Sequence, residues 1–138
     1  MEHTLTVVIP ALNEAEGLGR LLTQLSFQTC RSEQVVVADA RSTDATREVA
    51  ESLGATVVDG GMPAVGRNAG AAIATTELLL FLDVDVDLDS GFIEQVVAEF
   101  FERGLTIAGA RIEPLEREPG NLFACEVANF YLEAMQYV

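Results

Sequence analysis

The stretch Leu78-Leu-Leu-Phe-Leu-Asp-Val-Asp-Val-Asp-Leu-Asp89 joins five consecutive apolar residues to a run in which aspartate and apolar residues alternate. A short, unbroken apolar run is typical of a strand that is covered on both faces, as in a parallel sheet. Residues 78–82 therefore predict a buried strand at the centre of a sheet. The aspartates that follow come at the carboxyl end of that strand, where open parallel sheets bind their ligands.

Strand and helix patterns alternate on both sides of this stretch. The other expected strands are Leu5–Ile9, which Pro10 ends, Gln34–Asp39, Ala55–Val58 and Leu105–Ile112. The expected helices are Glu14–Gln28 with Asn13 as N-cap, Thr43–Leu53 before Gly54, Val65–Thr75, Ser90–Arg103 before Gly104, and Leu122–Val138. The alternation predicts a three-layer α/β/α fold with a mainly parallel sheet. Residues 1–138 are expected to form a single domain, because this length is typical of one.

The chain has 22 acidic residues, eight arginines and no lysine, and its formal net charge is −14. A field this negative disfavours nucleic acid and anionic membranes as partners. The lack of lysine excludes mechanisms that need a lysine within the chain. Cys30 and Cys125 lack the spacing of a metal site and are expected to be free thiols in a reducing compartment. A cytoplasmic location is expected, with peripheral contact at the inner membrane face as the alternative.

Polar residues gather where the expected strands end. The loop Pro10–Glu14 follows the first strand, Asp39 ends the second, and Asp83 and Asp85 follow the strand at 78–82. Because the carboxyl ends of parallel strands meet at one edge of the sheet, these segments are expected to build one ligand site.

The spacing of Asp83, Asp85 and Asp87 predicts a metal site at this edge. In an extended segment, residues two apart point the same way, so these carboxylates repel one another unless a cation lies between them. Mg²⁺ and Mn²⁺ prefer oxygen ligands of this kind, and the ion would in turn hold a diphosphate. The alternative is a solvated acidic turn that caps the next helix.

Three other polar positions near the strand ends each allow a structural interpretation. Asp39 fits a turn after a strand as well as a ligand contact. Ser42, Thr43 and Asp44 are expected to cap the helix that follows them. Arg67 begins a helix, where it would bind a phosphate or a base edge, or else form a surface ion pair.

Four segments together resemble one known family. They are Thr6-Val-Val-Ile-Pro-Ala-Leu-Asn-Glu14, Val35-Val-Val-Ala-Asp-Ala-Arg-Ser-Thr-Asp44, Gly66-Arg-Asn-Ala-Gly70 and Leu79-Leu-Phe-Leu-Asp-Val-Asp85. Their order and spacing, from about residue 4 to residue 93, are similar to those of family 2 glycosyltransferases, whose DxD motif the last segment resembles. The resemblance implies a Rossmann-like GT-A fold. It also implies transfer of a sugar, with inversion, from a UDP- or GDP-sugar donor to an acceptor hydroxyl that the sequence does not identify.

The resemblance implies roles for individual residues. The nucleoside pocket would be lined by the loop after the first strand, with Pro10, Ala11, Leu12 and Glu14. Asp39 would hydrogen-bond the base, and Arg67 would lie near the base or the phosphates. Asp83 would lie near the ribose and the metal. Asp85 would be the main ligand of the Mn²⁺ or Mg²⁺ that bridges the phosphates, and Asp87 is the third ligand that the spacing alone suggests.

The sequence departs from the family pattern in two ways. Ala40 and Arg41 replace an aspartate and a glycine of the second motif, which alters the turn there. The family's catalytic carboxylate lies in an ED motif well after the DxD, and no convincing ED motif follows residue 93. The base and the acceptor-binding part are therefore expected outside the chain, which would be truncated on its C-terminal side. The apolar helix 122–138 would then be exposed and would pair with a second copy in a homodimer.

The leading expectation is an enzyme, a metal-dependent glycosyltransferase of which this chain carries the donor and metal site. A non-catalytic nucleotide-sugar-binding module would also explain the missing base. A phosphatase of the haloacid dehalogenase class would use Asp83 as nucleophile and Asp85 as general acid, although Asp87 stands where that motif has Thr or Val. A nucleotidyltransferase usually has a Gly-rich, basic loop where this chain has Pro10–Glu14.

Overall fold

The computed structural model describes residues 4–109, 113–114, 118–121 and 125. The chain divides into two compact units, Met1–Gln95 and Val96–Val138. The single domain expected over residues 1–138 stays a prediction. The expected helix 122–138 and the homodimer through it fall outside the described residues, except for Cys125. Both cysteines are free, as expected.

Strands and helices alternate along the described part of the chain. The strands are β1 (Leu5–Ala11), β2 (Gln34–Asp39), β3 (Thr56–Asp59) and β4 (Leu78–Phe81). The helices are α1 (Ala15–Ser26), α2 (Thr46–Ser52), α3 (Pro63–Ala72) and α4 (Phe92–Glu102), and α4 contains the boundary between the two units. The strands are all parallel, in the order β3-β2-β1-β4, which confirms the predicted fold class. None of the helices within the described ranges is long and apolar enough to cross a membrane.

β4 lies at the edge of the described sheet, so the expectation that it is central is wrong. β1 is the central strand: it pairs with β2 on one side and with β4 on the other, and six of its seven residues are buried. Leu79 and Phe81 of β4 are each 42% exposed. An apolar run shows that a strand can be buried, but it does not show which strands flank it.

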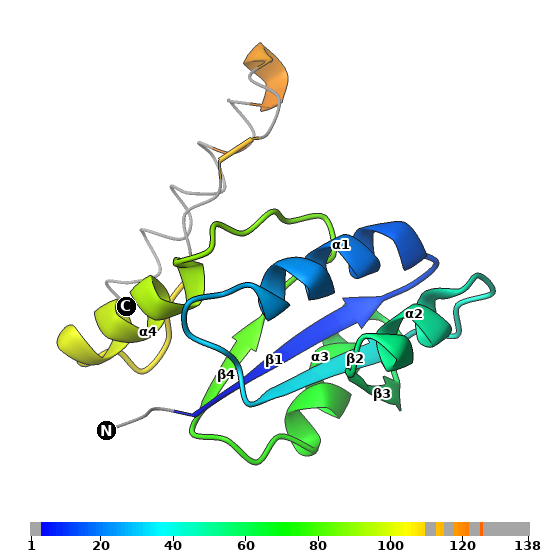
Figure 1. Cartoon of the computed structure of the whole chain (residues 1–138), viewed down its shortest axis with the longest axis horizontal. Coiled ribbons are helices and arrows are strands. Elements are labelled where there is room, and N and C mark those ends of the chain that lie inside the picture. The colour runs from blue at the N-terminus through cyan, green and yellow to red at the C-terminus, as the bar shows by residue number, and fades with distance from the viewer. Residues whose placement is uncertain (1–3, 110–112, 115–117, 122–124, 126–138) are drawn as a thin grey trace. The chain divides into compact units, whose positions relative to one another are not determined.

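The strand order reverses between β1 and β4. The chain first runs from β1 through α1, β2 and α2 to β3, and then returns across the sheet through α3 to β4. Right-handed crossovers in opposite directions place their helices on opposite faces of a sheet. Accordingly, α1 and α2 pack together on one face and α3 packs on the other, which gives the three expected layers (Figure 1). A crevice forms where the order reverses, outside the carboxyl ends of the strands.

Glycines bring α3 very close to the sheet. A Cβ atom added to Gly70 would lie 2.3 Å from Cγ1 of Val8, and one added to Gly66 would lie 3.4 Å from the Cβ atoms of Pro10 and Ala38. On the other face, α1 packs beside α2 and buries its four leucines: Leu18, Leu21, Leu22 and Leu25. The core of the first unit therefore consists of β1 and β2 with a helical layer on either side.

Some local expectations hold and others do not. Gly54 and Gly104 follow α2 and α4 with positive φ angles (84° and 62°), as expected of glycines that end helices. The expected strand Leu105–Ile112 is wrong over residues 105–109, which form no strand, and Ile107 there is 82% exposed. Residues 110–112 lie outside the described residues. Pro10 does not end β1, which continues to Ala11.

Candidate functional site

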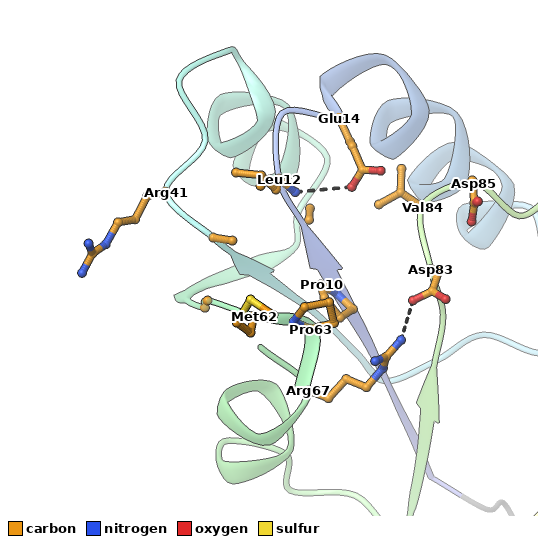
Figure 2. A pocket seen from close by; sticks show the side chains of 14 residues that line it. Pro10, Leu12, Glu14, Arg41, Met62, Pro63, Arg67, Asp83, Val84 and Asp85 are labelled. Atoms are coloured by element: carbon orange, nitrogen blue, oxygen red, sulfur yellow. Dashed lines mark hydrogen bonds and ion pairs between the residues drawn. The ribbon is translucent and has the colours of Figure 1, made fainter. Parts of the chain in front are cut away.

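A pocket of about 820 Å³ opens beyond the carboxyl ends of the strands, next to the crevice between β1 and β4 (Figure 2). Each strand contributes to it through the segment that follows. The lining residues are Pro10, Ala11, Leu12, Glu14, Ala40, Arg41, Gly60, Gly61, Met62, Pro63, Arg67, Asp83, Val84 and Asp85. The structure thus brings together all the residues expected at the donor and metal site except Asp39 and Asp87.

Pro10 lies in β1 beyond the last residue that pairs with β4. That residue is Val8, whose carbonyl accepts a hydrogen bond from the backbone N–H of Leu82 (3.1 Å). Backbone groups two residues apart face the same side of a strand, so Pro10 faces the side from which β4 has departed. A residue without an N–H group leaves no donor unpaired there. The proline is therefore compatible with a central strand, and the space beside it becomes one wall of the pocket.

The loop after β1 is fastened to the loop after β2. Asn13, which has a positive φ of 55°, donates its backbone N–H to the Ser42 hydroxyl (2.9 Å), and its side-chain oxygen accepts the backbone N–H of Thr43 (2.7 Å). The backbone N–H of Glu14 donates to the Thr46 hydroxyl (3.0 Å). The expectation that Asn13 is the N-cap of α1 is therefore wrong. Glu14 holds that position, with no side-chain capping bond.

Asp44 joins the same two loops. Its carboxylate accepts hydrogen bonds from the backbone N–H of Ala15 (3.2 Å) and from the backbone N–H of Thr46 (3.0 Å) at the start of α2. The Thr46 hydroxyl also donates to it, and this bond is the main reason why the pKa of Asp44 lies below its ordinary value; burial opposes the shift. One carboxylate thus accepts backbone N–H groups from the first turns of both α1 and α2.

Asp83 and Arg67 form an ion pair on the wall of the pocket (Figure 2). The guanidinium Nη2 of Arg67 donates to Oδ1 of Asp83 over 2.6 Å, and the two side chains are 36% and 63% exposed. Arg67 comes from α3 and Asp83 follows β4, so the pair bridges two elements of the pocket. The surface ion pair that the sequence suggested for Arg67 is therefore present, and it lies inside the expected site.

The segment after Asp83 turns at Val84 and Asp85 instead of continuing as a strand. The buried Val84 side chain lies against Gly17 of α1, where an added Cβ atom would be only 2.9 Å from Cγ1 of Val84. Val84, Asp85 and Glu14 also line an adjoining groove of about 410 Å³ on the α1 side. The extended geometry that would align Asp83, Asp85 and Asp87 is therefore absent, and that premise of the metal prediction is wrong.

Asp87 faces α1 and does not line the pocket. Its Oδ1 forms an ion pair with Nε of Arg20 (3.1 Å) and accepts a hydrogen bond from Nε2 of Gln24 (3.1 Å). The Gln24 side chain also accepts the backbone N–H of Leu88 (3.1 Å). The buried Gln28, just beyond α1, accepts the N–H of Ile93 and donates to the carbonyl of Asp89. A single row of side chains thus fixes the acidic segment along α1.

The donor set of the pocket fits a metal ion that is shared with a phosphate. The described residues contain no group of three His, Cys, Asp or Glu side chains that could hold a metal alone. Asp83 and Asp85 both line the pocket, however. Mg²⁺ sites commonly use one or two carboxylates, with substrate phosphates and water completing the coordination. An ion that binds together with a diphosphate needs no third carboxylate, whereas an ion held by three aspartates does not fit this arrangement.

Asp39 is buried and does not line the pocket. It is 1% exposed, accepts the backbone N–H of Ser42 (3.2 Å) and pairs with Nη1 of Arg47 (3.1 Å). Arg47 also contacts Asp59 (3.0 Å), and the two carboxylates, Asp59 first, raise the pKa of Arg47. Arg41, next along the turn, has a positive φ of 66° and extends away from the pocket (Figure 2). The ligand role expected for Asp39 stays a prediction, and its visible contacts support the turn.

The loop before α3 belongs to the pocket, although none of its residues is among those expected at the site. Gly60, Gly61, Met62 and Pro63 line the pocket, and only glycine fits at residue 60, where a Cβ atom would be 2.8 Å from the carbonyl oxygen of Ala38. The loop follows β3 at the same sheet edge as the other segments. The rule that ligands bind at carboxyl ends of strands would have found it.

Comparison of the sequence with known proteins places the chain in a family of glycosyltransferases. A sequence profile of the family described as "Glycosyl transferase family 2" matches residues 6–126. The chain is 32% identical over 110 residues to a 4,4'-diaponeurosporenoate glycosyltransferase of Staphylococcus haemolyticus, covering 73% of the chain and 29% of that enzyme. It is 38% identical over 110 residues to a validoxylamine A glucosyltransferase of Streptomyces hygroscopicus subsp. jinggangensis, covering 68% and 25%. The chain therefore spans between a quarter and a third of the length of these two relatives.

Solved structures share the fold. Glucosyl-3-phosphoglycerate synthase from Mycobacterium tuberculosis, in complex with Mn²⁺, UDP and glucosyl-3-phosphoglycerate, matches with a TM-score of 0.56 and 25% identity, covering 75% of this chain and 40% of that one. S. aureus TarS matches in fold with a TM-score of 0.65 and 24% identity, covering 83% of this chain and 23% of that one. These structures confirm the GT-A fold that the motifs implied.

Proposed function

Because the chain belongs to glycosyl transferase family 2, we propose that its pocket binds the nucleotide-diphospho-sugar donor and a divalent metal ion for inverting transfer to an acceptor hydroxyl. The observation that carries the proposal is the position of the pocket. Segments from all four strands converge at the reversal point of the sheet, and they present both apolar surface and carboxylates there. Apolar surface suits a nucleoside, and carboxylates suit the metal ion that binds with a diphosphate.

UDP is the proposed nucleotide, with GDP as the alternative. The Mycobacterium tuberculosis relative is in complex with UDP, UDP-glucose and Mn²⁺ in its solved structures, at 25% identity to this chain. The mouth of the pocket offers Pro10, Leu12 and Met62 as apolar contacts for a base and ribose. A flat ring that packs on such side chains removes apolar surface from water, which favours binding.

Asp83 and Asp85 would hold the metal ion, Mn²⁺ or Mg²⁺, and Arg67 would contact the phosphates. A bound divalent ion supplies neutralisation of the diphosphate, which makes the nucleotide a better leaving group. The turn at Val84, fixed against Gly17, holds the two carboxylates on the pocket wall. The fastened loops after β1 and β2 keep the nucleoside side of the pocket in place.

Asp39 and Asp87 would have to leave their present partners before either could contact a ligand. Asp39 would reach a base only if the turn at Ala40–Ser42 moves, because it is buried and bonded to Ser42 and Arg47. Asp87 would reach a metal only after leaving Arg20 and Gln24. Because the chain belongs to glycosyl transferase family 2, the alternative of a haloacid-dehalogenase phosphatase is not proposed. A module that binds without transfer is one outcome of the test of this proposal.

The proposal is tested by calorimetric titration of the chain with UDP and with GDP, in the presence and absence of Mn²⁺ and at high salt. We expect binding that needs Mn²⁺ and that Asp85→Asn abolishes. Glu51→Gln, at an exposed carboxylate on α2, makes the same charge change outside the pocket and should bind like the wild type. Failure of folded wild-type protein to bind either nucleotide with Mn²⁺ would contradict the proposed site. Binding of UDP-glucose without transfer or hydrolysis of its glucosyl group would identify a binding module.

A further inference from the structure

The ion pair between Arg67 and Asp83 places a cation where the proposed metal would bind. The guanidinium lies 2.6 Å from Oδ1 of Asp83, and both side chains line the pocket (Figure 2). The inference drawn from this pair rests on the proposed function, in which Asp83 and Asp85 hold the metal. A divalent ion on the same carboxylate would be close to the guanidinium, and like charges at such a distance repel each other. Arg67 and the metal therefore compete for Asp83.

The charges of the pocket show why this competition matters. The pocket contains three carboxylates, Glu14, Asp83 and Asp85, and the guanidinium of Arg67, whereas the side chain of Arg41 extends away from it (Figure 2). The empty pocket therefore has a net negative charge within a chain of net charge −14, which disfavours a diphosphate. A divalent ion would cancel this charge, but it must compete with the Arg67 guanidinium for Asp83. The metal ion would reduce the negative charge that repels the nucleotide. The nucleotide would draw Arg67 away from the carboxylate that the metal needs.

We propose that Arg67 is an exchangeable cation that couples the binding of metal and nucleotide. In the free protein it occupies Asp83 and disfavours binding of a metal alone. When a diphosphate arrives, the guanidinium moves to the phosphate oxygens, and Asp83 becomes available to the metal. The planar fork of arginine suits phosphate as well as carboxylate. A partly exposed ion pair contributes little stability, so the exchange costs little.

The test measures Mn²⁺ binding with no nucleotide present, by electron paramagnetic resonance of the free ion, at fixed ionic strength. Arg67→Gln removes the competing charge and should bind Mn²⁺ about tenfold more tightly than the wild type, as expected for losing a unit charge a few ångströms from a dication. The same variant should bind UDP in the presence of Mn²⁺ more weakly than the wild type. UDP should therefore raise the Mn²⁺ affinity of the wild type far more than that of Arg67→Gln.

Two further variants serve as controls. Arg103 pairs with Glu99 over 2.6 Å and is 48% exposed, so Arg103→Gln removes a similar ion pair and the same charge outside the pocket. It should leave Mn²⁺ affinity unchanged. Arg67→Lys keeps the charge at the pocket and should bind Mn²⁺ alone about as weakly as the wild type. If Arg67→Gln folds poorly by circular dichroism, Arg67→Met removes the same charge and takes its place, with the same expected gain in Mn²⁺ affinity.

The outcomes separate this inference from the proposed function. If wild type binds UDP with Mn²⁺, but Arg67→Gln binds Mn²⁺ alone no better than the wild type, the coupling role of Arg67 is wrong and the donor site stands. If Arg67→Lys binds Mn²⁺ alone as tightly as an Arg67→Gln variant that binds it more tightly than the wild type, the positive charge does not cause the competition. The inference is then also wrong. If wild type does not bind UDP with Mn²⁺ at all, the proposed function itself is contradicted.

Discussion

Gly70 is the position where the close packing of α3 on the sheet can be tested most directly. An alanine Cβ there would lie 2.3 Å from Cγ1 and 3.2 Å from Cγ2 of the fully buried Val8, against an ordinary contact of 3.4 Å or more. Overpacking a filled core costs about 1–3 kcal/mol, and a shortfall of this size belongs at the upper end. Alanine regains about 1 kcal/mol of helix propensity. Gly70→Ala should therefore lower the free energy of unfolding by about 2 kcal/mol.

A second substitution makes this reasoning specific to the Gly70–Val8 contact. Val8→Ala alone removes two buried methyl groups and should cost about 2 kcal/mol. In the double variant, the methyl group introduced at position 70 occupies the space that the valine methyls leave. The double variant should therefore lose about 1 kcal/mol, which is the cost of Val8→Ala less the regained helix propensity, and not the additive value of about 4 kcal/mol.

Urea unfolding followed by far-ultraviolet circular dichroism gives these free energies for all four proteins. Gly19→Ala is the control for helix propensity, because its Cβ would be 3.4 Å from the nearest atom, Cγ1 of Val49. It should leave stability unchanged or raise it by up to about 1 kcal/mol. Additive losses in the double variant, or a Gly70→Ala protein as stable as the wild type, would refute the steric argument.

Contacts around the site give three more predictions. Gly17→Ala should push Val84 outward and raise the Kd of UDP with Mn²⁺ roughly tenfold in calorimetry, since small misplacements of binding groups are costly; an unchanged Kd would show that the turn tolerates the shift. Gln28→Leu should lower the free energy of urea unfolding by about 1–3 kcal/mol, because it leaves the N–H of Ile93 unsatisfied; a variant as stable as the wild type would show that this N–H finds another partner. Asp44 has a lowered pKa in the folded state, so its contribution to stability is present above 3.8 and is lost as pH falls through the folded pKa. Asp44→Asn should therefore reduce the drop in melting temperature between neutral pH and pH below 3.8, and an identical drop would contradict this.

The sequence predicts the elements and their layers well because both depend on local patterns. Strands show as apolar runs, helices as leucine spacing, and the two glycines with positive φ mark helix ends. The place of β4 in the sheet is not predictable in this way. It depends on the direction in which the chain crosses from β3, which no local pattern encodes. The apolar run at 78–82 indicates that residues can be buried and not where their strand lies, and β1 holds the central place.

The candidate site is predictable as a location, but not in its side-chain pairings. The strand-end rule brings Pro10, Glu14, Asp83 and Asp85 to one pocket. It cannot show that the chain turns at Val84, because that turn depends on the glycine opposite it on α1. Nor can it show that Asp39 is buried against Arg47, since an ionic partner eight residues away leaves no periodic signal.

The row of contacts along α1 also bears on how the protein folds. Gly17, Arg20, Gln24 and Gln28 hold residues that lie more than 60 positions later in the chain. Contacts of such long sequence separation form only after a large loop has closed, and they slow folding. We therefore expect the acidic segment to take its final shape among the last steps, after β4 has joined β1. The ability to bind a ligand would then appear only in molecules whose sheet is already complete.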